Sequence, residues 1–191
     1  MELTGLQPLS DIVISIPTWL QELAASDRPR HSVEDRMELV LEMVAKNIDD
    51  GGGPFAAGVF DSEGYLVGAG VNRVVPASAA IAHAEMVAIA AAGQRLGTWN
   101  LGASRPRQLV TSTEPCAMCL GAVPWSGVSS MATGARDSDA RAVGFDEGDK
   151  MADWAALLEA RDITVIRDVL RERSVELLQQ YAQTGGEIYN G

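Results

Sequence analysis

Apolar positions along the chain fall into stretches of helical and of strand spacing, separated by breaks rich in glycine and proline. Near the N-terminus, residues 12–23 predict a short helix around Pro17. After Ser32, which suits a helix N-cap, apolar side chains recur three or four residues apart as far as Ile48. This pattern predicts an amphipathic helix behind an N-terminal extension of residues 1–30.

From residue 55 onward, segments of strand and helix pattern alternate. Two strands around a turn that contains Gly64 predict an antiparallel hairpin, and the later alternation favours a largely parallel sheet. Residues 31–191 therefore form a single α/β domain in our prediction. Its expected elements are strands 55–60 and 65–75, a helix 80–96, a strand 108–113, a helix from Pro115 to about Trp125, a strand 127–134, short helices 137–142 and 153–160, a strand 163–169 and a helix 175–183.

Length and composition favour one enzyme domain of the cytoplasm. The 191 residues can bury a core without disulfides, and two cysteines suggest a reducing compartment. The sequence has no apolar run near the ~20 residues of a membrane span and no basic N-terminal flank of a secretory signal. A formal net charge of −11 argues against a nucleic-acid partner and favours a small neutral substrate.

The two cysteines and one of the two histidines lie in a single pattern, His83-Ala84-Glu85 followed by Pro115-Cys116-Ala117-Met118-Cys119. Residues three apart share a helix face, so both thiols can reach one ion. Pro115 suits the first helical position, where the helix dipole favours thiolates. His83 is expected at a helix start, with Glu85 beside the metal and not bound to it.

Three ligands leave Zn²⁺ one free position, which is typical of a catalytic site in which a bound water is acidified. Glu85 is then the general base. A redox dithiol or half of a structural zinc site would also explain the two cysteines alone. The dithiol leaves His83 and Glu85 unexplained, and His31 is the one spare histidine for a fourth ligand.

Several further pieces accompany this pattern, namely Gly52–Phe55, Asn72, Thr113 and Glu114, Gly121 and Ala122 with Trp125, and Gly144–Glu147. With them the chain resembles the cytidine deaminase-like superfamily and, within it, the bacterial guanine deaminases. The resemblance implies a three-layer α/β/α fold with a five-stranded mixed sheet, a bound Zn²⁺ and a homodimer. Pro124 departs from the pattern and should end or kink its helix ahead of Trp125.

The same resemblance implies the substrate-binding residues. Asn72 would hydrogen-bond a purine, Glu147 would accept from its exocyclic amino group and ring N–H, and Trp125 would wall the pocket. Phe55 is a further substrate-binding candidate, and the segment 188–190 would close the pocket with Tyr189. From the residues alone, Asn72 suits a turn cap, Glu147 a solvated loop, Trp125 the core, and Tyr189 a surface contact equally well.

The function that these residues predict is hydrolysis of an aminopurine, guanine giving xanthine and ammonia. Glu85 moves protons between water, ring nitrogen and leaving amine, and Glu147 is a candidate second proton carrier. Guanosine or an s-triazine of the ammeline type is an alternative substrate for the same site. A transfer-RNA wobble adenosine deaminase is a more distant rival, and a non-catalytic zinc protein is the alternative from another class.

Overall fold

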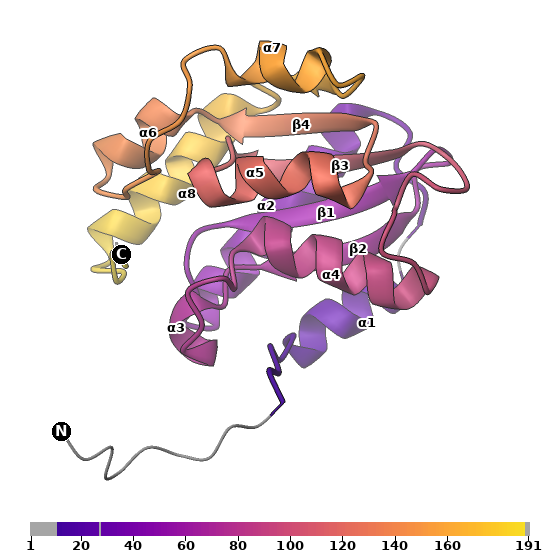
Figure 1. The fold of residues 1–191 in the computed structure, drawn as a ribbon. Helices are drawn as coiled ribbons and strands as arrows, with labels where there is room; N and C mark the ends of the chain where they lie inside the picture. Colours follow the sequence, from indigo (N-terminus) through magenta and orange to yellow (C-terminus); the bar gives the residue numbers. More distant parts are fainter. Residues whose placement is uncertain (1–10, 27, 190–191) are drawn as a thin grey trace, which may run out of the picture.

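A five-stranded mixed sheet forms the centre of the structure (Figure 1). The computed structural model describes residues 11–26 and 28–189, so Asn190 of the predicted closing segment lies outside the described residues. The strands are β1 (Ala56–Asp61), β2 (Leu66–Val71), β3 (Arg107–Thr113), β4 (Ser130–Ala135) and β5 (Thr164–Ile166). Their order is β2-β1-β3-β4-β5, antiparallel from β2 to β3 and parallel from β3 to β5. The predicted mixed sheet with its N-terminal hairpin is confirmed.

Helices cover both faces of this sheet, which confirms the three layers. The helices are α1 (Thr18–Ser26), α2 (Val33–Asp49), α3 (Val74–Ala77), α4 (Ala84–Leu96), α5 (Ala117–Ser126), α6 (Asp137–Ala142), α7 (Trp154–Glu159) and α8 (Arg171–Gln183). Neighbouring residues of β1 point to opposite faces: Phe60 lies in the core with α1 and α2, and Val59 in the core with α4, α5 and α7. Within the described part, no helix is both long and apolar enough to cross a bilayer.

Helix α4 lies unusually close to β2 because glycine and alanine face each other there. A Cβ atom on Gly70 would stand 2.2 Å from the carbonyl oxygen of Ala84, and one on Gly68 would stand 2.5 Å from the Cβ of Ala92. Any side chain at these two positions of β2 would push the helix away from the sheet. The packing therefore determines how near α4 and its N-cap His83 lie to the sheet.

Several element boundaries differ from the sequence prediction. Strand β2 ends at Val71 and not at 75, because residues 74–77 turn into α3. Helix α4 begins at residue 84 and not at 80, since His83 has extended backbone angles. Helix α1 starts just after Pro17, where a helix over 12–23 was predicted. Strand β5 covers 164–166 and not 163–169, and α8 begins at 171 and not at 175.

The two prolines of the Cys-x-x-Cys segment differ from the prediction in different ways, Pro115 in its place and Pro124 in its effect on the helix. Cys116 is the N-cap of α5, so Pro115 precedes the helix and does not open it. Pro124 lies inside α5, which continues to Ser126. A proline in the last turn of a helix removes few backbone hydrogen bonds, and Gly127, with a φ of 78°, ends the helix in its place.

Candidate active site

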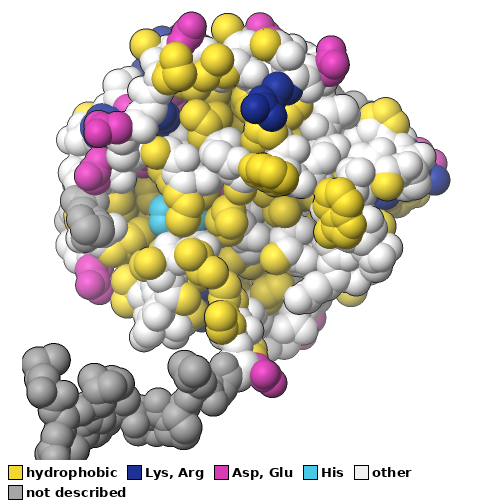
Figure 2. All heavy atoms as spheres, in the orientation of Figure 1, with side chains coloured by type: hydrophobic (Ala, Val, Ile, Leu, Met, Phe, Trp, Pro, Cys, Tyr) yellow, Lys and Arg dark blue, Asp and Glu magenta, His cyan; other side chains and the backbone are white. Residues whose placement is uncertain are grey.

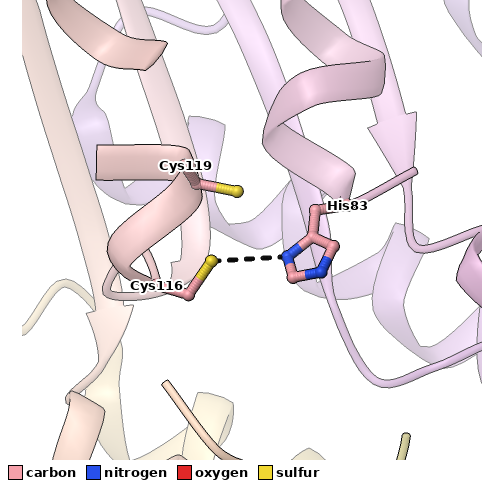
Figure 3. A group of neighbouring side chains, drawn as sticks. All are labelled: His83, Cys116 and Cys119. Atoms are coloured by element: carbon pink, nitrogen blue, oxygen red, sulfur yellow. Dashed lines mark hydrogen bonds between the residues drawn. The ribbon is translucent and has the colours of Figure 1, made fainter. Parts of the chain in front are cut away.

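The three predicted metal ligands lie at the amino ends of two neighbouring helices (Figure 3). His83 is the N-cap of α4, Cys116 is the N-cap of α5, and Cys119 lies in the first turn of α5. The Sγ of Cys116 stands 3.5 Å from the Nδ1 of His83. One ligand atom from each residue lies within 4.8 Å of the other two.

This set of donors fits a zinc ion. Tetrahedral Zn²⁺, with a Zn–N distance of about 2.0 Å and a Zn–S distance of about 2.3 Å, places nitrogen and sulfur about 3.5 Å apart. The distance from His83 to Cys116 matches this value. A hydrogen bond between the two thiol groups lowers the pKa of Cys116 and raises that of Cys119, so Cys116 is the first of the two to become a thiolate. A bound ion would keep one position free.

Glu85 lines the same cavity as His83 and Cys116. It lies in the first turn of α4 and is 8% exposed. Burial, followed by the charge of Cys116, raises the pKa of this carboxyl group. A carboxyl group with a raised pKa both takes up and returns protons more readily near neutral pH. The structure thus brings Glu85 to the predicted place, and proton transfer by it stays a prediction.

Asn72 and Glu147 face the same cavity from different elements. Asn72 follows β2, and its Oδ1 accepts the backbone N–H of Val74 at 3.2 Å, so its amide N–H groups remain for a ligand. Glu147 lies on the loop after α6 and is 6% exposed. Burial raises the pKa of Glu147 to about 8. The solvated loop position considered for Glu147 is therefore wrong.

Three aromatic rings form one wall of the cavity. Phe145 packs edge to face against Phe55, with ring centroids 4.8 Å apart, and against Tyr189, with centroids 5.3 Å apart. The hydroxyl group of Tyr189 lies over Gly53, where a Cβ atom would stand only 2.1 Å from it. Phe145 was not predicted as a site residue, although its place between Gly144 and Glu147 was a signal.

Trp125 does not line this cavity in the single chain. Its side chain is 82% exposed on α5, so both the predicted pocket wall and the core position are wrong for this chain by itself. Met118 and Gly121 are exposed on the same helix. Residues 118, 121 and 125 are spaced so that they share the helix face that points away from the sheet.

Sequence reasoning missed Asn47, a fully buried residue of α2. Its Nδ2 donates to the carbonyl oxygen of Gly53 at 2.7 Å and to that of Asn72 at 3.2 Å. It thereby joins the segment under Tyr189 to the end of β2. The signal was a polar residue three positions after Val44, on the apolar face of the predicted helix.

Comparison with known proteins places this site in a family. The protein family described as "Cytidine and deoxycytidylate deaminase zinc-binding region" matches residues 30–135. The guanine deaminase of Bacillus subtilis is 35% identical over 115 residues, which are 60% of this chain and 71% of that protein.

Two solved structures are similar over nearly the whole chain. A protein in complex with 2,6-diaminopurine has 45% identity and a TM-score of 0.90, covering 94% of this chain and 97% of its own. A guanine deaminase from Nitrosomonas europaea has 43% identity and a TM-score of 0.86, covering 94% and 99%. With the shared fold and the His83, Cys116 and Cys119 cluster, these matches mean that the chain belongs to the cytidine and deoxycytidylate deaminase family.

Proposed function

We propose that this protein is a zinc-dependent deaminase that hydrolyses guanine to xanthine and ammonia. The observation that carries the proposal is one buried cavity that joins the metal-ligand cluster to two carboxyl groups, Glu85 and Glu147, and to the amide of Asn72. The similar guanine deaminases, and the purine bound to one similar protein, support the same assignment.

Zinc held by His83, Cys116 and Cys119 would acidify a water molecule. Glu85 is the base that takes a proton from this water as its oxygen bonds to C2 of guanine. Glu85 then returns the proton to ring nitrogen N3. The proton that remains on the added oxygen then passes through Glu85 to the amino nitrogen, the bond between C2 and that nitrogen breaks, and ammonia leaves as the C2 carbonyl group of xanthine forms.

Glu147 and Asn72 would recognise the purine. The carboxyl oxygens of Glu147 suit the N–H groups at N1 and at the 2-amino group, which adenine lacks on its corresponding edge. Because burial raises the pKa of Glu147 to about 8, this group can also exchange a proton with the leaving amine. Asn72 offers amide N–H donors to the acceptor atoms of the base.

A substrate panel tests the proposal. Ammonia release is measured with the zinc-loaded protein on guanine, guanosine, ammeline, adenine and cytosine at matched concentrations. We expect guanine to give the highest kcat/KM and adenine to be rejected by a factor on the order of 10⁴, because a site built for N–H groups leaves its acceptors unpaired with adenine. If guanosine or ammeline were turned over faster than guanine, that compound would be the substrate of this site. If no compound were turned over, the proposal that the protein deaminates these bases would be rejected.

A homodimer through α5 is part of the proposal. The exposed face of this helix carries Met118, Gly121 and Trp125 and no charge, whereas the whole chain has a formal net charge of −11. Figure 2 shows hydrophobic side chains gathered over this face of the molecule. Two chains with this negative charge repel each other least at an uncharged surface. Contact there also removes the apolar side chains of α5 from water.

Sedimentation tests the dimer. We expect a mass near twice 20.3 kDa for the protein, the mass of one chain for Trp125→Glu, and a dimer for the control Tyr65→Glu, whose site lies in the hairpin turn. A monomeric wild-type protein would reject this part of the proposal.

A further inference from the structure

Lys150 is one of only two lysines in the chain, and it is buried. Its side chain is 8% exposed, whereas that of Lys46 is 47% exposed. The Nζ of Lys150 donates to the carbonyl oxygen of Pro115 at 2.6 Å and lies 2.8 Å from the Oδ1 of Asp137. An ammonium group leaves water only where such partners replace it, so this lysine has a defined position.

Asp137 joins Lys150 to a second cation. Its Oδ2 accepts the Nε of Arg141 at 2.7 Å, and the Nη2 of Arg141 donates to the carbonyl oxygen of Gly148 at 2.6 Å. The backbone N–H of Asp137 donates to the Oε2 of Glu114, which is 3.0 Å away and buried. The loop 145–150 is thus held at residues 148 and 150.

Glu147 lies between these anchors and the opening of α5. Its carbonyl oxygen accepts the backbone N–H of Ala117 at 2.9 Å, so the loop also contacts the helix that carries Cys116 and Cys119. The loop itself bears three carboxyl groups, those of Asp146, Glu147 and Asp149. Asp146 pairs with Arg141, whose Nη1 stands 3.3 Å from the Oδ1 of Asp146.

We propose that Lys150, paired with Asp137, is a positioning residue that holds the loop 145–150 against the segment before α5 and so fixes the place of Glu147 in the cavity. This inference rests on the proposed function, in which Glu147 binds the purine. Lys150 itself does not line the cavity that contains Glu147. It acts through the loop, and its charge also reaches the Glu147 carboxyl group: burial raises the pKa of this group, and Lys150 lowers it by a smaller amount.

Lys150→Met tests the inference, with Lys46→Met as the matched control for loss of a lysine. We expect kcat/KM for guanine to fall about 10- to 100-fold in Lys150→Met, since a small displacement of a positioned group has effects of that size. Both KM and kcat should change, with zinc content near that of the wild type and a lower melting temperature, because Asp137 loses its buried partner. Lys150→Arg should recover most of the loss, because it keeps the charge and the donors. The control should behave as the wild type.

Glu147→Gln separates positioning from a general structural effect. If Lys150 acts through Glu147, Lys150→Met costs little further in the Glu147→Gln background. Wild-type kcat and KM in Lys150→Met, or an equal loss in both backgrounds, would overturn the inference.

Hydrogen exchange of peptides that cover residues 143–152 and 114–120 gives a readout besides turnover. Faster exchange is expected in Lys150→Met and not in Lys46→Met, and unchanged exchange would overturn the inference even if guanine proves not to be the substrate. Absence of guanine turnover in the wild type would reject the proposed function alone.

Discussion

Replacing Gly53 by alanine tests whether Tyr189 closes the substrate cavity. The new Cβ atom would stand 2.1 Å from the hydroxyl oxygen of Tyr189 and 2.9 Å from its Cζ. Gly51 has a φ of 75°, but the backbone of Gly53 lies outside the left-handed region, so alanine is tolerated there apart from this contact. The backbone is fixed by Asn47, and the tyrosine ring has to move.

The size of the effect follows from the distances. Carbon atoms pack without repulsion at about 3.5–4.0 Å, so the ring must shift by more than about 1 Å. Losing its edge-to-face contact with Phe145 costs about 0.5–1.5 kcal/mol, and a displacement of this size in a binding site lowers activity by up to about 100-fold. We therefore expect kcat/KM for guanine to fall about 10- to 100-fold in Gly53→Ala, chiefly through KM.

Steady-state kinetics of Gly53→Ala, Tyr189→Ala and the double variant provide the assay. In the double variant, the alanine at position 53 should add almost nothing to the loss caused by Tyr189→Ala. Tyr65→Ala is the control for loss of a tyrosine ring, because Tyr65 is exposed in the hairpin turn and does not line the cavity. Wild-type kinetics for Gly53→Ala, or an equal loss with and without Tyr189, would refute the reasoning.

Four other outcomes follow from the structure. Glu85→Gln should lower kcat by about 10²- to 10⁴-fold with unchanged zinc content, and zinc loss in this variant would make Glu85 a ligand. Cys119→Ser should lower both zinc content by elemental analysis and the melting temperature, and retention of both would argue against this ligand. Asn47→Leu leaves the buried carbonyl group of Asn72 unpaired, at about 1–3 kcal/mol, whereas that of Gly53 keeps the N–H of Phe55; urea unfolding measures the loss, and no loss of stability would contradict the role of the Asn47 amide. The hydrogen bond from Arg171 lowers the pKa of Asp139, so the stability that it adds is present above the ordinary pKa of about 3.9 and is lost as pH falls through the lowered value. Asp139→Asn should therefore be less stable than the wild type at pH 7 and equal to it near pH 2 in thermal unfolding, whereas equal stability at pH 7 would refute this.

The metal ligands and the order of elements could be predicted because local rules determine them. The spacing of Cys116 and Cys119 indicates one helix face, and the alternation of strands and helices indicates the layers. Both predictions depend on neighbours in sequence. The boundaries failed where a local rule competed with tertiary packing, as at Pro124, which α5 accommodates near its end.

The remaining parts of the site depend on residues far apart in sequence. Asn47 and Asn72 meet across 25 positions, and Lys150 reaches Pro115 across 35. No period or motif encodes such pairs. The exposed position of Trp125 likewise depends on which way α5 turns on the sheet, and α5 has apolar residues on all sides, so its sequence does not indicate the buried face.

The contact between α4 and β2 determines which substitutions this protein can tolerate. Gly68 and Gly70 do not line the cavity, yet they determine how near α4, the helix capped by His83, comes to the sheet. When a library of all single substitutions is selected for activity, variants with a side chain at Gly68 or Gly70 should therefore be lost as completely as variants of the metal ligands. For this enzyme, distance from the substrate is a poor guide to mutational tolerance.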